Sequence, residues 1–377
     1  MSKHLRIFGL IAVLIPIAAS AMATEIIVRK DGTGDFLSIN DAFTIAGAND
    51  TITVGPGTYA EPFIDVTIPV VLRSELGPDV TIVDGQNTNR IFRFRYAIGS
   101  KVDGLTFAFG RAVAIASAGG AIVVDTGANV VIQNCKFHNN TADAGGALYV
   151  TQPMTVVTVT DCSFENNDAP FNGGGMSVVL GGVLNVDECI FEENFAGVYG
   201  GAVHAGEGSM LNVSGSLFCE NSSDDVAGAI YMFRAMGTIQ SSTFWRNESP
   251  GAISGTVTAQ ESGAARISRN IIAEDTAGFG IQFEWGVANH DCNVFWNNAR
   301  GPIGKGSLAD DEVVSDPLFC GALVGNFMLS EGSPATESNS ACGLLIGAFD
   351  VGCGAVAVEE STWGRIKSLY APDEDQE

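Results

Sequence analysis

The chain has 377 residues, of which 43 are acidic and 19 are basic, and its net charge at pH 7 is −24. Such an acidic surface argues against nucleic acid as a partner, because phosphates require a basic surface, and it disfavours polyanionic substrates unless a divalent cation bridges them. The 46 glycines and the low share of charged residues, 16%, are typical of a protein built from short strands and many turns.

The amino terminus has the pattern of a secretory signal peptide. Lys3 and Arg6 precede an apolar run over residues 7–19, and a small-x-small cleavage site ends at Ala23. The run is too short to cross a bilayer whose apolar core is about 30 Å thick. We therefore predict a signal peptide over residues 1–23 and no membrane span. The mature protein is expected to be secreted to the cell surface or extracellular space, with the periplasm as an alternative.

Residues 24–60 are expected to form an amino-terminal cap and a first coil. Five apolar residues follow helical spacing and predict one amphipathic helix: Phe36, Ile39, Ala42, Phe43 and Ala46. The run from Thr51 to Val54 then predicts a strand, which a Gly-Pro-Gly turn follows. Such a helix can cover the end of a repeat protein, where core and strand edges are otherwise exposed.

Basic residues gather in the next part of the chain, at Arg90, Arg93, Arg95, Lys101 and Arg111. The string IFRFRYAI alternates Arg with apolar residues, which predicts a strand with Arg outside and Ile or Phe inside. A basic strip that holds an acidic sugar is the alternative.

A repeat of about 27 residues dominates the middle of the chain. Each copy has a Phe, an Asn three places later and then a Gly-Gly-Ala-like triplet. The phenylalanines are Phe137, Phe164, Phe191, Phe218 and Phe244, and the asparagines are Asn140, Asn167, Asn194, Asn221 and Asn247. Cys135, Cys162 and Cys189 lie two places before the first three phenylalanines.

The apolar runs of these repeats are too short for helices, so the period predicts a solenoid of strands. We predict an all-β, single-stranded parallel β-helix over residues 61–300, with about nine or ten coils. Equivalent side chains should stack in columns, with Phe in the core, Asn amides bonded from coil to coil, and cysteines as buried thiols.

The alternating GGA[ILV] and FxxN motifs over about residues 104–298 resemble the repeats of the polymorphic outer membrane proteins. Those proteins are bacterial surface adhesins on the pectin-lyase-like right-handed β-helix. The resemblance implies a right-handed β-helix and a role in adhesion. Residues 31–61 are also similar to the amino-terminal region of pectinesterases and of other secreted β-helix proteins.

Strand alternation places a possible binding row on one face. Four equivalent apolar residues are expected to point inward: Leu148, Met176, Val203 and Ile230. The next residue in each strand then points outward, and these residues stack from coil to coil. The row is Tyr149, Ser177, His204 and Tyr231. An exposed row of aromatic rings and an imidazole is a platform for a sugar, although such side chains are also ordinary in strands.

Turn aspartates are the weak catalytic candidates: Asp143, Asp168, Asp224 and Asp225. Carboxylates on neighbouring coils suit acid–base catalysis or Ca²⁺, although aspartate is also common in turns for local hydrogen bonding. Pectinesterase-like and polygalacturonase-like motif sets are incomplete, since VDT at 124–126 and the Arg365-Ile366-Lys367 string stand alone. The scattered histidines predict no metal site.

The repeat ends near residue 300, and residues 301–355 resemble the closing segment of exported bacterial β-helix proteins. The disulfide candidates are Cys292, Cys320, Cys342 and Cys353, whose pairing the sequence leaves open. The tail over residues 356–377 is acidic at its end and amphipathic before it, with Trp363, Ile366, Leu369 and Tyr370 on one helical face.

These observations favour an exported, non-catalytic protein that acts in surface adhesion or carbohydrate binding. The alternatives are a polysaccharide lyase or glycoside hydrolase of the pectin-lyase-like fold and a structural envelope spacer. No cofactor beyond a possible Ca²⁺ is predicted. The expected partner is a polysaccharide or cell-surface glycan, and the oligomeric state is open.

Overall fold

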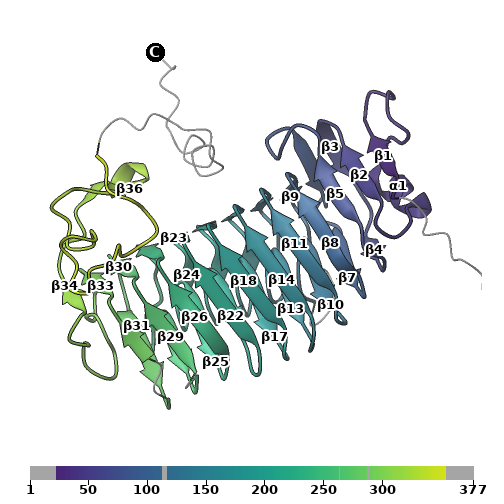
Figure 1. Cartoon of the computed structure of the whole chain (residues 1–377). Helices are drawn as coiled ribbons and strands as arrows, with labels where there is room; N and C mark the ends of the chain where they lie inside the picture. Colours follow the sequence, from purple (N-terminus) through teal and green to yellow (C-terminus); the bar gives the residue numbers. More distant parts are fainter. Residues whose placement is uncertain (1–22, 113–116, 263, 287–288, 354–377) are drawn as a thin grey trace, which may run out of the picture.

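A computed structural model describes residues 23–112, 117–262, 264–286 and 289–353 (Figure 1). Apart from Ala23, the predicted signal peptide lies outside the described residues, as does the predicted amphipathic tail. The described chain winds into one elongated parallel β-solenoid with three long sheets, which confirms the predicted fold class. Sheets A and B have 11 strands each and sheet C has nine.

Nine successive coils each contribute one strand to sheet C, one to sheet A and one to sheet B, in that order, and the two ends of the described solenoid add further strands to sheets A and B. The strands of sheet A are β1 (Glu25–Val28), β2 (Thr51–Val54), β5 (Val71–Ser74), β8 (Ile98–Asp103), β11 (Asn129–Gln133), β14 (Val156–Thr160), β18 (Val183–Asp187), β22 (Met210–Ser214), β26 (Met236–Gln240), β29 (Ala265–Ser268) and β32 (Asn289–Asp291). Those of sheet B are β3 (Gly57–Ala60), β6 (Thr81–Asp84), β9 (Thr106–Ala108), β12 (Lys136–His138), β15 (Ser163–Glu165), β19 (Ile190–Glu192), β23 (Leu217–Cys219), β27 (Thr243–Trp245), β30 (Ile271–Ala273), β33 (Val294–Trp296) and β34 (Val313–Val314). Those of sheet C are β4 (Ile64–Val66), β7 (Phe92–Arg95), β10 (Ile122–Asp125), β13 (Leu148–Thr151), β17 (Met176–Val179), β21 (Val203–Ala205), β25 (Ile230–Phe233), β28 (Gly255–Gln260) and β31 (Phe279–Glu284).

Equivalent phenylalanines stack along the core. Phe137 and Phe164 lie in register on β12 and β15, with ring centroids 4.6 Å apart and ring planes inclined by 3°. The stack continues through the later coils, and the five repeat phenylalanines are all fully buried. Because each ring lies on its equivalent in the next coil, the 27-residue period sets the strand register.

A buried asparagine ladder runs beside the phenylalanines. The Asn167 Nδ2 donates to Asn194 Oδ1 at 2.9 Å and to the carbonyl oxygen of Phe137 at 2.9 Å. Asn140, Asn194 and Asn221 make the equivalent bonds with their own neighbours. These bonds satisfy turn backbone that cannot reach water.

The Gly-Gly-Ala-like triplets form the entry into sheet C. In one copy Gly173 has a φ of +63°, which favours glycine, and a Cβ on Gly174 would lie 2.4 Å from the carbonyl oxygen of Gly201. The coils therefore approach too closely at this turn for a side chain. Three two-residue strands form a small fourth sheet just before this point, namely β16 (Asp168–Ala169), β20 (Phe195–Ala196) and β24 (Ser222–Ser223).

A short helix, α1 (Ile39–Ile45), lies at the amino-terminal end of the solenoid (Figure 1). Ser38 Oγ accepts a hydrogen bond from Asp41 N at 3.1 Å, and the buried Glu61 carboxylate accepts from the backbone of Ile39 at 2.7 Å. Both contacts satisfy free N–H groups of the first turn. Ile39 and Ala42 are fully buried in the core cluster.

The segment after residue 314 doubles back over the outer face of sheet B. It contains β35 (Phe319–Gly321), the 3₁₀ turn η1 (Ala322–Val324) and β36 (Asn326–Leu329), which pairs antiparallel with β35. Ala348 N donates to Thr243 Oγ1 on β27 at 3.1 Å. Two disulfides, Cys292–Cys342 and Cys320–Cys353, tie this closing segment together and to the last coils.

The four other cysteines, Cys135, Cys162, Cys189 and Cys219, are free and buried. The first three occupy the equivalent position two residues before the core phenylalanine of their coils, as predicted for the column of thiols. Among the described residues, no helix is long and apolar enough to cross a membrane.

Candidate functional site

Two tryptophans project outward from sheet B near the carboxy-terminal end of the solenoid. Trp245 ends β27 and Trp296 ends β33, and each follows a buried core phenylalanine, so strand alternation turns the indoles away from the core. Ala273 of β30 lies in register between them. Two strand spacings, roughly 9.6 Å, therefore separate the two backbones, and the small Ala leaves the space between the rings open.

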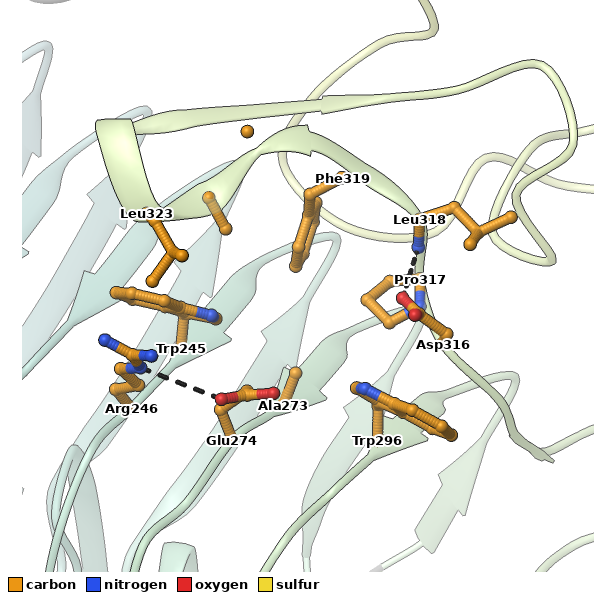
Figure 2. A pocket seen from close by; sticks show the side chains of 12 residues that line it. Trp245, Arg246, Ala273, Glu274, Trp296, Asp316, Pro317, Leu318, Phe319 and Leu323 are labelled. Atoms are coloured by element: carbon orange, nitrogen blue, oxygen red, sulfur yellow. Dashed lines mark hydrogen bonds and ion pairs between the residues drawn. The ribbon is translucent and has the colours of Figure 1, made fainter.

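The closing segment supplies the opposite wall. Residues 316–323 face the two tryptophans across a cleft with a volume of about 370 Å³ (Figure 2). This volume lies within the range of about 300–1,000 Å³ that is usual for small-molecule sites. We call this space the tryptophan cleft. The tryptophans and charged residues that line it are Trp245, Arg246, Glu274, Trp296 and Asp316. Leu318, Phe319 and Leu323 also line it.

Two of the three charged side chains that line the cleft come from equivalent turn positions. Arg246 and Glu274 each follow a strand of sheet B directly and have φ values of 52° and 62°. Arg246 Nε lies 3.7 Å from Glu274 Oε2, and Arg246 Nη1 lies 3.9 Å from Glu220 Oε1 of the preceding coil. On the opposite wall, Asp316 Oδ1 accepts a hydrogen bond from Leu318 N at 2.8 Å.

The two indoles differ in accessibility. Trp245 is only 6% exposed, because Phe327 contacts its ring edge-on at 5.5 Å and the Arg246 guanidinium lies 4.2 Å above its ring centroid. Trp296 is 37% exposed. Trp245 is therefore a packed wall of the cleft, and Trp296 is the ring that a ligand can reach.

The binding row expected from the sequence does align. Tyr149, Ser177, His204 and Tyr231 occupy matching positions on β13, β17, β21 and β25. The expected exposure is wrong, however, since Ser177, His204 and Tyr231 are buried and Tyr149 is half-buried.

The turns that precede sheet C cover this row. The Tyr199 ring lies on the Tyr231 ring with a centroid distance of 4.7 Å, and Val226 and Ile253 pack beside them. Burial lowers the pKa of His204 to about 4 and raises the pKa of Tyr231. Binding by this row stays a prediction, but it was based on exposed ring faces, and these side chains are buried or half-buried.

The four candidate aspartates come from three different coils. Asp143 Oδ2 accepts from Ser117 N at 3.0 Å, as a structural turn residue does. Asp168 is in register with Thr141 and Phe195 rather than with another carboxylate. Asp224 and Asp225 are exposed neighbours in one turn. The structure gathers no catalytic pair from these four, and their catalytic role stays a prediction.

The basic strip is largely neutralised. Arg93 pairs with Asp125 at 2.6 Å and Arg95 pairs with Asp65 at 2.6 Å, while Phe92 and Phe94 of the same strand are buried. This arrangement matches the prediction of outward arginines on an alternating strand. It leaves these guanidinium groups already engaged with carboxylates.

Within the described residues, no group of three or more His, Cys, Asp or Glu side chains could hold a metal ion. A role for Ca²⁺ stays a prediction.

The tryptophans were not predicted as a site from the sequence. The available signal was the dipeptide Phe-Trp, which occurs at 244–245 and again at 295–296, two coils later in the same repeat position. The pattern places both indoles on one outer face. It gives no information about the closing segment that turns this face into a cleft.

Comparisons with known proteins agree with the architecture. The family described as "Right handed beta helix region" matches residues 99–201. Together with the strand pairing, this match defines the class, which is that of right-handed parallel β-helix proteins. No curated protein matches the sequence significantly.

Solved structures show a distant likeness. The pectin methylesterase PemA from Erwinia chrysanthemi is 11% identical with a TM-score of 0.37, over 78% of this chain and 94% of that one. The A-module of the mannuronan C-5 epimerase AlgE6 from Azotobacter vinelandii is 16% identical with a TM-score of 0.31, over 74% and 93% of the two chains. The alginate lyase AlyGC of family PL6 is 14% identical with a TM-score of 0.28, over 76% and 53%. These scores are too low to support any argument about activity.

Proposed function

We propose that this protein is a non-catalytic carbohydrate-binding β-helix that holds a glycan in the tryptophan cleft. The observation that carries the proposal is the partly exposed indole of Trp296, which shares a cleft with Arg246 and Glu274 on its own wall and with Asp316 on the opposite wall. Sugar rings present apolar C–H surfaces that stack on aromatic faces, and their hydroxyl groups bond to charged side chains at the edges.

An exported role in surface adhesion agrees with the signal-peptide pattern at residues 1–23 and with the two disulfides. Disulfides persist mainly in oxidising compartments, outside the cytosol. The rigid solenoid would then present the cleft at a fixed distance from a surface. A pure spacer, which is the structural alternative, has no need of an open indole beside charged groups.

A polysaccharide-active enzyme is the second candidate. Glu274 and Asp316 lie on opposite walls of the tryptophan cleft, and glycoside hydrolysis uses a pair of carboxyl groups that flank the bond to be cleaved. Glu274 is also close to Arg246, an arrangement that suits binding at least as well as proton transfer. A reducing-end assay on a polysaccharide panel separates the candidates, because turnover lost in both Glu274→Gln and Asp316→Asn would favour the enzyme.

A glycan array tests the binding proposal directly. The chain lacking residues 1–23 is compared with Trp296→Ala and with Trp285→Ala, a matched control whose indole is 73% exposed on the turn after β31. We expect the parent chain and Trp285→Ala to bind the same glycans and Trp296→Ala to lose them. Equal profiles for all three proteins, or no binding by any, would overturn the proposal.

A further inference from the structure

We propose that the glycan bound in the tryptophan cleft carries positively charged amino groups, so that the ligand is an amino sugar rather than a uronate. The inference rests on the proposed function and names the class of sugar for the same site. It follows from the charges around the cleft, from the state of the two indoles and from the acidity of the neighbouring surface.

Carboxylates outnumber basic groups at the cleft. Glu274 and Asp316 are acidic lining residues, Arg246 is the basic residue among those that line the cleft, and Glu220 approaches Arg246 from the preceding coil. Three carboxylates and one guanidinium thus lie in or beside the cleft, and two of the carboxylates, Glu220 and Glu274, approach the guanidinium itself. A sugar carboxylate would meet net repulsion here, whereas an ammonium group would complete the pairing of charges.

Asp316 is the carboxylate best placed for such a cation. It comes from the closing segment, on the opposite wall from Arg246 and Glu274. Its Oδ1 accepts the Leu318 backbone N–H, which fixes the carboxylate at the edge of the cleft. An ammonium group on a sugar stacked against Trp296 would then lie between an indole and a carboxylate.

The indoles favour the same charge. The face of an indole attracts cations, and Trp245 already carries the Arg246 guanidinium 4.2 Å from its centroid. Trp296 remains partly open and has no such partner among the cation–π pairs of the described residues. A charged amino sugar would give Trp296 the partner that Trp245 finds within the protein.

The surface beside the cleft also favours a positively charged ligand. Burial raises the pKa of the Cys219 thiol, and nearby Glu192, Glu220 and Glu193 raise it further, while Arg246 opposes them. These carboxylates therefore gather on the coils that precede the cleft. The net charge of −24 adds a long-range field that repels polyanions and attracts polycations.

The test compares three oligosaccharides of equal length by isothermal titration: a glucosamine hexamer, its N-acetylated form and a galacturonate hexamer. The proteins are the mature chain, Trp296→Ala, Asp316→Asn and, as a matched control, Asp310→Asn, which changes an exposed carboxylate before β34. At about pH 6 the amino groups are charged, and at about pH 9 they are largely neutral.

We expect the glucosamine hexamer to bind about threefold to tenfold more tightly than its N-acetylated form at about pH 6, with the preference lost at about pH 9. Asp316→Asn should remove most of this preference, Asp310→Asn should keep it, and Trp296→Ala should abolish binding of both hexamers. Loss of binding in Trp296→Ala would also distinguish binding in the cleft from non-specific attraction of a polycation to the acidic surface.

The outcomes distinguish the two proposals. Tight binding of the galacturonate hexamer that needs Trp296 would overturn the amino-sugar inference and keep the binding function. Equal affinity for the glucosamine hexamer and its N-acetylated form, with no change in Asp316→Asn, would also overturn the amino-sugar inference and keep the binding function. Binding that Trp296→Ala leaves unchanged would overturn both. No binding of any hexamer would overturn the amino-sugar inference, and the glycan array then decides the binding function.

Discussion

Ser177 and His204 lie in register on neighbouring strands of sheet C, with Ser177 Oγ and His204 Nδ1 3.0 Å apart. Both side chains are buried. The pair resembles a nucleophile and its base, but the covering turns leave a substrate no access. It acts as a satisfied polar contact inside the protein, and it makes stability depend on pH.

The first prediction concerns His204 and acid. Burial lowers its folded-state pKa to about 4, against 6.5 for an ordinary histidine, so the unfolded chain takes up a proton first as the pH falls. The stabilisation is fully present above about pH 6.5 and is lost as the pH falls towards 4. A shift of this size corresponds to roughly 3 kcal/mol. Urea unfolding of the parent and of His204→Gln between about pH 7 and pH 4 measures it, and parallel pH profiles for the two proteins would contradict it.

The second prediction concerns His290, whose pKa is raised in the folded state, whereas that of His204 is lowered. The hydrogen bond from His290 Nδ1 to the buried Glu312 Oε2, 2.9 Å long, raises the pKa of His290, and nearby Asp291 and Asp311 raise it further. The stabilisation is fully present below about pH 6.5 and is lost as the pH rises through the folded-state pKa. The pKa from NMR titration of the His290 ring should exceed that of a free histidine, and a value at or below it would refute the assignment.

The third prediction concerns the asparagine ladder. Asn194 is fully buried, donates to Phe164 O and Asn221 Oδ1, and accepts from the backbone and side chain of Asn167. Asn194→Ala leaves several buried groups unpaired, so we expect a loss of about 3–5 kcal/mol in the free energy of unfolding. The control Asn129→Ala, which changes the exposed first residue of β11, should change the free energy of unfolding by less than about 0.5 kcal/mol. Similar losses in the two variants, measured by chemical denaturation, would contradict the ladder's role.

The fourth prediction concerns thiol chemistry. Four cysteines are free and buried, and the other four form two disulfides. Native protein should therefore resist a thiol-alkylating reagent, while protein unfolded without reductant should take up four labels. Mass spectrometry counts the labels, and fast labelling of the native state, or a count other than four after unfolding, would show that the thiols are arranged differently.

The sequence was sufficient for the fold because its period reports contacts directly. Phe137 and Phe164 are 27 residues apart and lie in register, so one spacing fixes the coil length, the strand pairing and the core. The Asn column follows from the same spacing.

The site was harder to predict because it depends on segments that do not repeat. Alternation gives the direction of His204 correctly but does not reveal that Tyr199, from a turn between sheets, packs over the row. The Phe-Trp dipeptides place Trp245 and Trp296 on one face. The wall that includes Asp316 and Phe319 comes from the closing segment, whose path over sheet B has no sequence signal of its own.

The most direct measurement for the central claim is a crystal structure of the mature chain with the strongest ligand from the glycan array. We predict a sugar ring stacked on the open face of Trp296, with its polar groups directed at Asp316 and Glu274. A glycan bound elsewhere, for example over Tyr149 and Tyr231, with the tryptophan cleft empty, would contradict the account.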